Sequence, residues 1–470
     1  MLAGPLLGGV IYALLADSGL NDAGRVTAAI ALWMATWWMT EAIPIPATGL
    51  IPLAAFPLFG ARTAQETAAP YGHELIYLFL GGFVLALSME RWGLHRRIAM
   101  TALRLVGDRA DRMVGAFILV TAFLSMWVSN TATAILMLPI AASLIRQTSG
   151  SNGSPGGLPG FTPALLLAIA YGASIGGIAT LIGTPPNLFL ASFARDHLGV
   201  DFGFARWMAM ALPLVVVLLV ILWLMLTRVL YRCAGAVLVV DGLDEKMGRM
   251  SRGESLTLWV FLGTALLWIL RPVLARLEFA GEVWLAGLTD SGIAILAALV
   301  LFVLPAGDGR RVMDWHAMRR LPWGLLILFG GGLSLAAAMQ ANGVSELIGA
   351  ALGRQDGLPP VLVILVTTTL MVFLTELTSN TATTAAMLPI FAAIADSLGV
   401  SPVLLATAAA VSASCAFMLP VATPPNAIVF GSGDLRIAQM VRAGIGMNII
   451  CIIAVTAWVI LVVGPVLGEG

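Results

Sequence analysis

The sequence predicts an all-α polytopic membrane protein built as an inverted repeat, and three observations carry this prediction. Of its 470 residues, 59% are hydrophobic and only 11% are charged, and apolar runs of about 20 residues recur along the chain. A polar motif inside an apolar segment occurs twice, at 129–140 and 379–390, with nine of twelve positions identical. A second motif, Thr-Pro-Pro-Asn, also occurs twice, at 184–187 and 423–426. We expect about eleven transmembrane helices, two re-entrant hairpins and two broken helices.

Four apolar runs open the chain and predict four spans. The stretch that follows, 91–112, carries six Arg. Its apolar residues Leu94, Ile98, Ala102 and Leu105 follow helical spacing, which indicates an amphipathic helix on the membrane surface. The four runs lie at 2–16, 25–41, 47–60 and 74–90.

The segment 114–145 is too long for one span and too short for two. As a helix its 32 residues would measure about 48 Å, against a hydrocarbon core of about 30 Å. Its polar centre, 129–133, would be costly in lipid unless something occupies it. Two half-helices that meet at this polar tip fit the length, provided that the tip faces protein or water. The segment 358–397 predicts a second hairpin for the same reasons.

Each hairpin is followed by a span with a Pro-Pro break. A Gly, Ser and Pro-rich linker at 147–160 precedes the first of these spans, which starts at Thr162 and breaks at 183–187. The second starts at Pro402 and breaks at 422–426. Two successive prolines remove two donors and disfavour helix before them, which frees backbone carbonyls. The remaining spans are expected at 206–230, 255–275, 283–304, 321–341 and 440–465, with a second surface helix at 344–356.

The halves are expected to have opposite orientations, because an odd number of spans separates equivalent elements. Of the 25 Lys and Arg residues, 18 then fall on the side of the N-terminus. The sequence therefore predicts a cytoplasmic N-terminus and an outer C-terminus in the cell (inner) membrane.

The repeated motifs also predict a binding site near the membrane midplane. Thr184 and Thr423 can cap helices that restart at Pro185 and Pro424. The carbonyl before each threonine, with nearby Ser, Thr and Asn oxygens, makes a neutral oxygen cage suited to an alkali cation. Helix N-termini and threonine hydroxyls suit a carboxylate or sulfate. No Lys or Arg lies in the motifs, so dipoles, amides and the cation would hold the anion.

At these residues the sequence resembles the divalent anion/sodium symporter (DASS) family, which carries dicarboxylates, citrate or sulfate. The resemblance rests on Ser-Asn-Thr at 129–131 and 379–381, Thr-Pro-Pro-Asn at 184–187 and 423–426, and the early motif at 38–44. It runs from about residue 30 to the C-terminus.

The resemblance implies sites for two sodium ions and one substrate. The first sodium would be held by Ser125, Ser129, Asn130 and the carbonyl of Gly183. The second would be held by Thr375, Thr378, Ser379, Asn380 and the carbonyl of Ala422. Substrate would meet Ser129, Asn130, Thr131, Thr184, Pro185, Ser379, Asn380, Thr381, Thr423 and Pro424.

The family also implies a homodimer in the lipid bilayer and an elevator mechanism. The hairpin, broken helix and following span of each half, 113–232 and 358–470, would form a transport unit. The spans and surface helix of each half, 1–112 and 233–357, would form the scaffold.

The function favoured is sodium-coupled uptake of a small di- or tricarboxylate, with succinate or malate as examples. Sodium-independent dicarboxylate exchange, or transport of another divalent anion such as sulfate, stays open. An enzyme is not expected, since no nucleophile, acid/base pair or metal cluster lies at membrane depth. No organic cofactor or nucleic-acid partner is expected either. Glu376, whose counterpart in the first half is Met126, could serve a cation, a proton or the structure alone.

Overall fold

The computed structural model is almost entirely helical, and it describes residues 1–151, 160–233, 248–278, 282, 285–307, 309–352 and 358–468. Among these residues, seven helices are long and apolar enough to cross a membrane, and five shorter apolar helices accompany them. Each predicted span overlaps a helix or a pair of helices separated by a break, but the helix in the span predicted at 283–304 begins only at Asp290. The described part of the chain also contains one short hairpin of strands β1 (Pro305–Gly307) and β2 (Arg310–Arg311).

The first half follows the predicted order, with shifted boundaries at its hairpin. In both halves the break also starts before the predicted residues 183–187 and 422–426, because the prolines already belong to the helix that follows. The first hairpin begins at Ala110 rather than at 114, and its second helix continues to Ser151, so the predicted start of the linker at 147 is wrong. An established helix adds further residues at little cost, which composition alone does not reveal. The rest of the predicted linker, 152–159, lies outside the described residues. The helices are α1 (Ala3–Leu14), α2 (Asp22–Thr40), α3 (Ile45–Thr48), α4 (Ile51–Leu58), α5 (Ala64–Ala68), α6 (Glu74–Arg91), α7 (Leu94–Arg104), α8 (Ala110–Ser125), α9 (Asn130–Ser151), α10 (Phe161–Ile178), α11 (Pro185–His197) and α12 (Phe204–Leu224).

The second half repeats this order, with one difference at its broken helix. The break between the two helices covers 413–423, whereas the first half has a shorter break at 179–184. The helices are α13 (Arg252–Leu274), α14 (Asp290–Val303), α15 (Trp323–Ala341), α16 (Val344–Leu352), α17 (Pro360–Thr375), α18 (Asn380–Ala395), α19 (Pro402–Ser412), α20 (Pro424–Phe430), α21 (Ile437–Trp458) and α22 (Gly464–Leu467).

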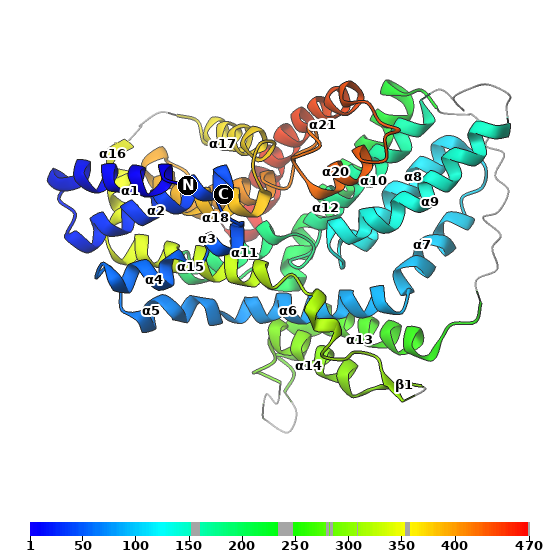
Figure 1. Cartoon of the computed structure of the whole chain (residues 1–470), viewed down its shortest axis with the longest axis horizontal. Coiled ribbons are helices and arrows are strands. Elements are labelled where there is room, and N and C mark those ends of the chain that lie inside the picture. Colours follow the sequence, from blue (N-terminus) through cyan, green and yellow to red (C-terminus); the bar gives the residue numbers. More distant parts are fainter. Residues whose placement is uncertain are drawn as a thin grey trace.

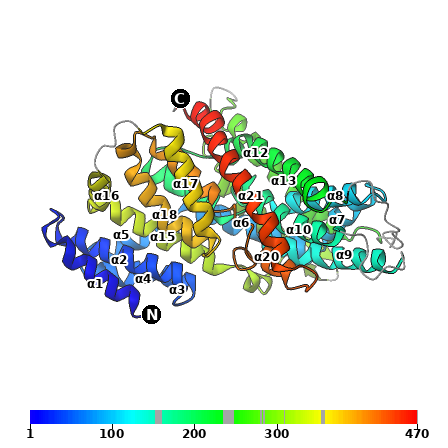
Figure 2. The same ribbon diagram turned by 90° about the horizontal axis from the view of Figure 1, so that it is seen from above.

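The two hairpins lie on either side of the broken helices. Figure 1 shows the first hairpin in cyan and the second in yellow to orange. α10 packs against both α8 and α9, and α19 packs against both α17 and α18. α20 belongs to the second half but contacts α9 and α10 of the first, and Figure 2 shows it beside α10. The Tyr171 hydroxyl of α10 donates to the carbonyl of Phe417 at 2.8 Å across the same boundary. The halves are therefore interlocked.

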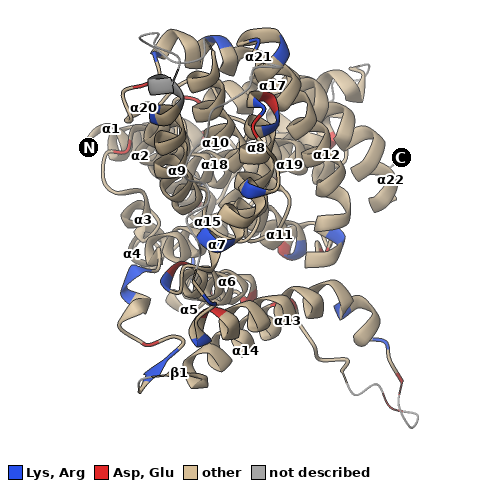
Figure 3. Ribbon diagram, turned by 90° about the vertical axis from the view of Figure 1, so that its right-hand side faces the viewer, with Lys and Arg blue, Asp and Glu red and all other residues tan. Residues whose placement is uncertain are grey.

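α6 of the first half packs against α15 of the second, and their direction distinguishes two ends of the molecule. Their rings Phe79 and Phe329 lie 5.3 Å apart, and Arg320, just before α15, pairs with Glu90 near the end of α6. The helices are thus antiparallel, with a Glu74 end and an Arg91 end. Figure 3 shows Lys and Arg mostly at helix ends and in connecting segments rather than along the packed helices.

Candidate functional site

Each hairpin has a non-helical tip that ends where the predicted polar motif begins, because all of the motif after its first serine is already helical. The tips are 126–129, between α8 and α9, and 376–379, between α17 and α18. Ser129 caps α9, because its Oγ accepts the N–H of Ala132 at 3.3 Å. Ser379 occupies the same position before α18 without a side-chain cap. Both tips therefore place the first turn of the second helix, with its free N–H groups, at the centre of the molecule.

The first predicted sodium site is a cluster of neutral oxygen atoms, which we call the first cage. Ser125 is fully buried, and its Oγ lies 2.6 Å from Asn130 Oδ1 and 2.7 Å from the carbonyl oxygen of Ala173. A Cβ added to Gly177 would lie 2.7 Å from Asn130 Oδ1 and 3.2 Å from the carbonyl oxygen of Gly183. Both oxygens therefore border the space beside Gly177. Hard cations take such oxygen ligands.

The second cage repeats this arrangement around Thr375. The buried Thr375 Oγ1 lies 2.7 Å from Asn380 Oδ1 and 2.9 Å from the carbonyl oxygen of Ala413. Thr378, implied for this site by the resemblance, has its hydroxyl 2.6 Å from Thr383 Oγ1 instead. The structure thus brings Thr375 and Asn380 together and leaves the Thr378 hydroxyl outside the hydrogen bonds of this cage.

A cavity of about 690 Å³ lies between the two tips and the two breaks. Every residue that the sequence suggested for substrate binding lines it. The chain also contributes the predicted ion-site residues Gly183, Thr378 and Ala422 to its wall. The suggested substrate residues are Ser129, Asn130, Thr131, Thr184, Pro185, Ser379, Asn380, Thr381, Thr423 and Pro424.

Among the described residues that line the cavity, none is Lys or Arg, and Glu41 is the one with a charged side chain. An anion there would therefore depend on hydroxyl and amide donors, and on the N-terminal turns of α9 and α18. Glu41, Ile45 and Leu325 also line the cavity. They lie at the Arg91 end, since the segment after Glu41 packs on the start of α15, where a Cβ on Gly324 would meet Pro46. The cavity therefore extends to the Arg91 end of α6 and α15.

The prolines begin their helices as predicted. Pro185 is the first residue of α11, and Pro424 is the first residue of α20. Thr423 caps α20 through a 3.3 Å hydrogen bond that its Oγ1 accepts from Asn426 N–H, whereas Thr184 makes no such side-chain bond. The predicted cap is thus present in the second half only.

The last residue of each Thr-Pro-Pro-Asn motif holds the break together, a role that the sequence reasoning missed. Asn187 is fully buried, and its Nδ2 lies within 3.1 Å of the carbonyl oxygens of Gly177, Ile178 and Thr180. Asn426 does the same for two carbonyls of the second break, at 3.3 and 3.0 Å. Buried carbonyls that a break leaves without helical partners need other donors. The asparagine at the end of both motifs was the signal in the sequence that could have identified this donor.

Comparisons with known proteins agree with this geometry. Residues 4–468 match the family described as the sodium:sulfate symporter transmembrane region. The chain is 40% identical to the sodium-dependent dicarboxylate transporter SdcS of Staphylococcus saprophyticus, over 100% of this chain and 92% of that protein. It is 42% identical to SdcS of Staphylococcus aureus, over 100% of this chain and 91% of that protein.

Two solved structures share the fold. One is the YdaH transporter of Alcanivorax borkumensis, with a TM-score of 0.58 and 18% identity over 94% of this chain and 98% of that one. The other is MtrF of Neisseria gonorrhoeae, with a TM-score of 0.61 and 16% identity over 96% of this chain and 97% of that one. The chain therefore shares the fold of these two membrane proteins, with several helices able to cross a membrane. The family and the names of the full-length relatives indicate a transporter and not an enzyme. Together with the full-length match, these findings confirm the resemblance, and the chain belongs to the sodium:sulfate symporter family, the divalent anion/sodium symporters.

Proposed function

We propose that the protein uses a sodium gradient to take up a small di- or tricarboxylate, with a C4-dicarboxylate such as succinate or malate favoured. One observation carries this proposal. Asn130 and Asn380 each belong to an oxygen cage and also line the central cavity, so one side chain serves an ion and an anion. The names of the full-length relatives support sodium as the ion and a dicarboxylate as the substrate.

The chemistry of the cages favours sodium over a proton. Their side chains are Ser, Thr and Asn, which do not titrate near neutral pH. A cation held by Asn130 or Asn380 would sit beside the substrate carboxylates and reduce their mutual repulsion. Ion and substrate would then stabilise each other, which is the basis of coupled transport.

Uptake of labelled succinate by proteoliposomes tests this function. We expect an inward sodium gradient to drive accumulation, and replacement of sodium by choline to reduce uptake to background. Ser125→Ala and Thr375→Ala should each raise the sodium concentration for half-maximal uptake about tenfold, because each removes one oxygen from a cage.

Thr369→Ala is the matched control, since its hydroxyl bonds only within α17, to Leu365. Equal uptake in sodium and choline, stimulated by dicarboxylate inside the vesicles, would instead identify an exchanger. Competition by citrate and sulfate would rank the other anions.

We infer that the Arg91 end faces the cytoplasm of a bacterial inner membrane, with the N-terminus inside and the C-terminus outside. The Lys and Arg distribution supports this orientation, because 18 of 25 fall on that side. The cavity then opens inward. The homodimer stays a prediction from the resemblance.

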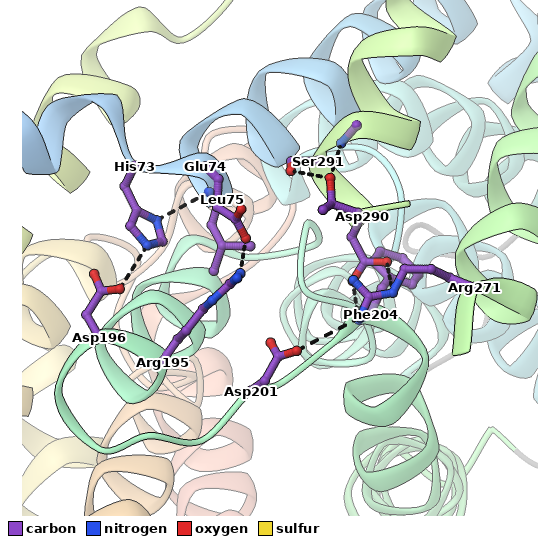
Figure 4. Close-up of polar contacts among 12 residues, drawn as sticks. His73, Glu74, Leu75, Arg195, Asp196, Asp201, Phe204, Arg271, Asp290 and Ser291 are labelled. Atoms are coloured by element: carbon purple, nitrogen blue, oxygen red, sulfur yellow. Dashed lines mark hydrogen bonds and ion pairs between the residues drawn. The ribbon is translucent and has the colours of Figure 1, made fainter. Parts of the chain in front are cut away.

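We also propose that 113–232 and 358–470 move as a transport unit against a scaffold of 1–112 and 233–357. Contacts across this boundary at the Glu74 end support the proposal (Figure 4). Arg195 of α11 pairs with Glu74 of α6, and His73 Nε2 lies 3.1 Å from Asp196 Oδ1. These contacts would close the outer side while the cavity opens inward. Further contacts across the boundary join Phe204 to Asp290, Arg271 to Asp201 and His197 to Gln340.

Removing the Arg195–Glu74 ion pair and the His73–Asp196 hydrogen bond should favour the outward-facing state. In Glu74→Gln/Asp196→Asn we expect the ratio of outward-facing to inward-facing protein to rise by up to about 30-fold. Such contacts near the surface contribute up to about 1 kcal/mol each. Val421 is 79% exposed and lines the cavity, so Val421→Cys reports access. Its labelling by an impermeant maleimide from the cytoplasmic side should fall.

Glu90→Gln provides the control, because its partner Arg320 lies in the scaffold as well. The three native cysteines are buried and give little background. Unchanged labelling in the double variant would show that these pairs do not hold the inward-facing state.

A further inference from the structure

Glu376 is a buried carboxylate at the tip of the second hairpin. It is 3% exposed, directly follows Thr375 of the second cage, and has Met126 as its counterpart in the first hairpin. A carboxylate at membrane depth is costly unless it has partners or a function. The two halves therefore differ by one negative charge next to otherwise similar cages.

Four donors surround this carboxylate, and none of them carries a charge. Glu376 Oε1 accepts the N–H groups of Phe417 and Met418 at 2.7 and 2.8 Å, and the side-chain amide of Asn448 at 2.8 Å. Oε2 accepts the N–H of Leu419 at 3.0 Å. Hydrogen bonds of this kind stabilise an ionised carboxylate but leave its charge in place.

The first half closes its break differently. There the hydroxyl of Thr180 donates to the backbone carbonyl of Met126, and Ala179 N–H donates to the carbonyl of Gly176 at 3.0 Å. The hairpin tip and the break are thus joined by a hydroxyl and a carbonyl, without a charged group. In the second half the longer break, 413–423, presents three consecutive N–H groups to Glu376 instead.

The same contacts connect Glu376 to the other wall of the second cage. Leu419, whose N–H Glu376 binds, accepts the N–H of Ala422 at 3.2 Å and the amide of Asn426 at 3.0 Å through its carbonyl. Ala422 is the residue whose carbonyl is proposed to hold the second sodium. Glu376 therefore fixes the hairpin side of the cage, through Thr375, relative to the break side.

We propose that Glu376 is a positioning residue of the second cage, and that its charge makes this cage the tighter sodium site, which fills before the first. The inference rests on the sodium-coupled function proposed above. A fixed negative charge attracts a nearby cation strongly in a medium of low dielectric constant. Among the described residues, no basic side chain binds this carboxylate, so bound sodium would be its counter-ion.

Sodium-dependent thermal stabilisation of purified protein, without substrate and with choline as the reference salt, tests the inference. The wild type should show stabilisation at a low sodium concentration. Glu376→Gln keeps the size and removes the charge, and should raise that concentration about tenfold or more. Glu376→Asp, which keeps the charge, should restore part of the affinity.

Asn448→Ala is the matched control, because it removes one donor and keeps the charge. It should leave the sodium concentration within about twofold of the wild type, whatever it does to the melting temperature in choline. If Glu376→Gln is folded and its sodium dependence equals that of the wild type, the inference is wrong.

A second comparison does not require Glu376→Gln to fold. Thr375→Ala should remove the low-concentration stabilisation, whereas Ser125→Ala should leave it, because only Thr375 belongs to the second cage. The reverse pattern would overturn the order of filling while leaving sodium coupling intact. A wild type that responds equally to sodium and choline would instead contradict the proposed function itself.

Discussion

Asn130→Ala and Asn380→Ala are each expected to reduce succinate uptake roughly 100-fold or more while leaving folded protein in the membrane. Each amide oxygen accepts a hydrogen bond from a cage hydroxyl, at 2.6 and 2.7 Å, and each side chain also lines the cavity. Alanine therefore removes an ion ligand and a substrate contact at once. The fold should survive, because both residues lie only partly buried at the start of a helix.

Initial rates of uptake at saturating sodium, normalised to protein recovered by size-exclusion chromatography, measure this effect. Asn21→Ala is a suitable control, since it removes the cap of α2 and does not touch the cavity. We expect it to lower stability by about 1 kcal/mol and to leave transport intact. Near-normal uptake by either cavity variant would show that the site assignment is wrong.

Gly177→Ala should also abolish most uptake, and for a different reason. The added Cβ would lie 2.7 Å from Asn130 Oδ1, which is too close, so the amide must move. Because that amide is the end of a flexible side chain, the fold can adapt. However, the movement breaks its contact with Ser125 and fills the space beside the Gly183 carbonyl. We expect the loss of uptake to be roughly 100-fold, with a small change in melting temperature.

Gly263→Ala provides the matched substitution, since a Cβ there meets nothing within 4 Å and the residue also lies inside a helix. It should transport normally. Sodium-dependent thermal stabilisation separates loss of ion binding from loss of substrate binding, because Gly177→Ala should weaken the response to sodium even when substrate is absent. A fully active Gly177→Ala would mean that the space beside this glycine is not used by an ion.

The fold and the lining of the cavity could be predicted because they follow from the free-energy cost of polar groups in lipid. A polar tip in an apolar segment and a Pro-Pro break in a span are unfavourable in lipid, so their positions mark where the membrane fold departs from plain helices. The repeat then places the tips and breaks of both halves together. The residues at 129–131 and 379–381 line the cavity for this reason.

The partners of individual polar groups could not be predicted in the same way. Asn187 lies in a recognised motif, and Thr378 and Glu376 lie just before one, but their partners depend on the course of the backbone through a tip or a break. Spacing in the sequence does not give that course. The exposed Asp196 likewise meets His73, which is 123 positions away. Such contacts arise from packing between units and have no local signature.

The interlocking of the two halves has a consequence for leakage. α20 is held between α9 and α10, and Tyr171 bonds across the same boundary, so neither half can advance without the other. If the unit moves as proposed, both cages and the cavity cross the barrier in a single stroke. A carrier with only one cage filled would cross the membrane with either Glu376 lacking a counter-ion or the amide of the empty cage lacking a cation. Unproductive cycles that dissipate the sodium gradient should therefore be rare, because a partly filled carrier would bury unsatisfied polar groups during the crossing.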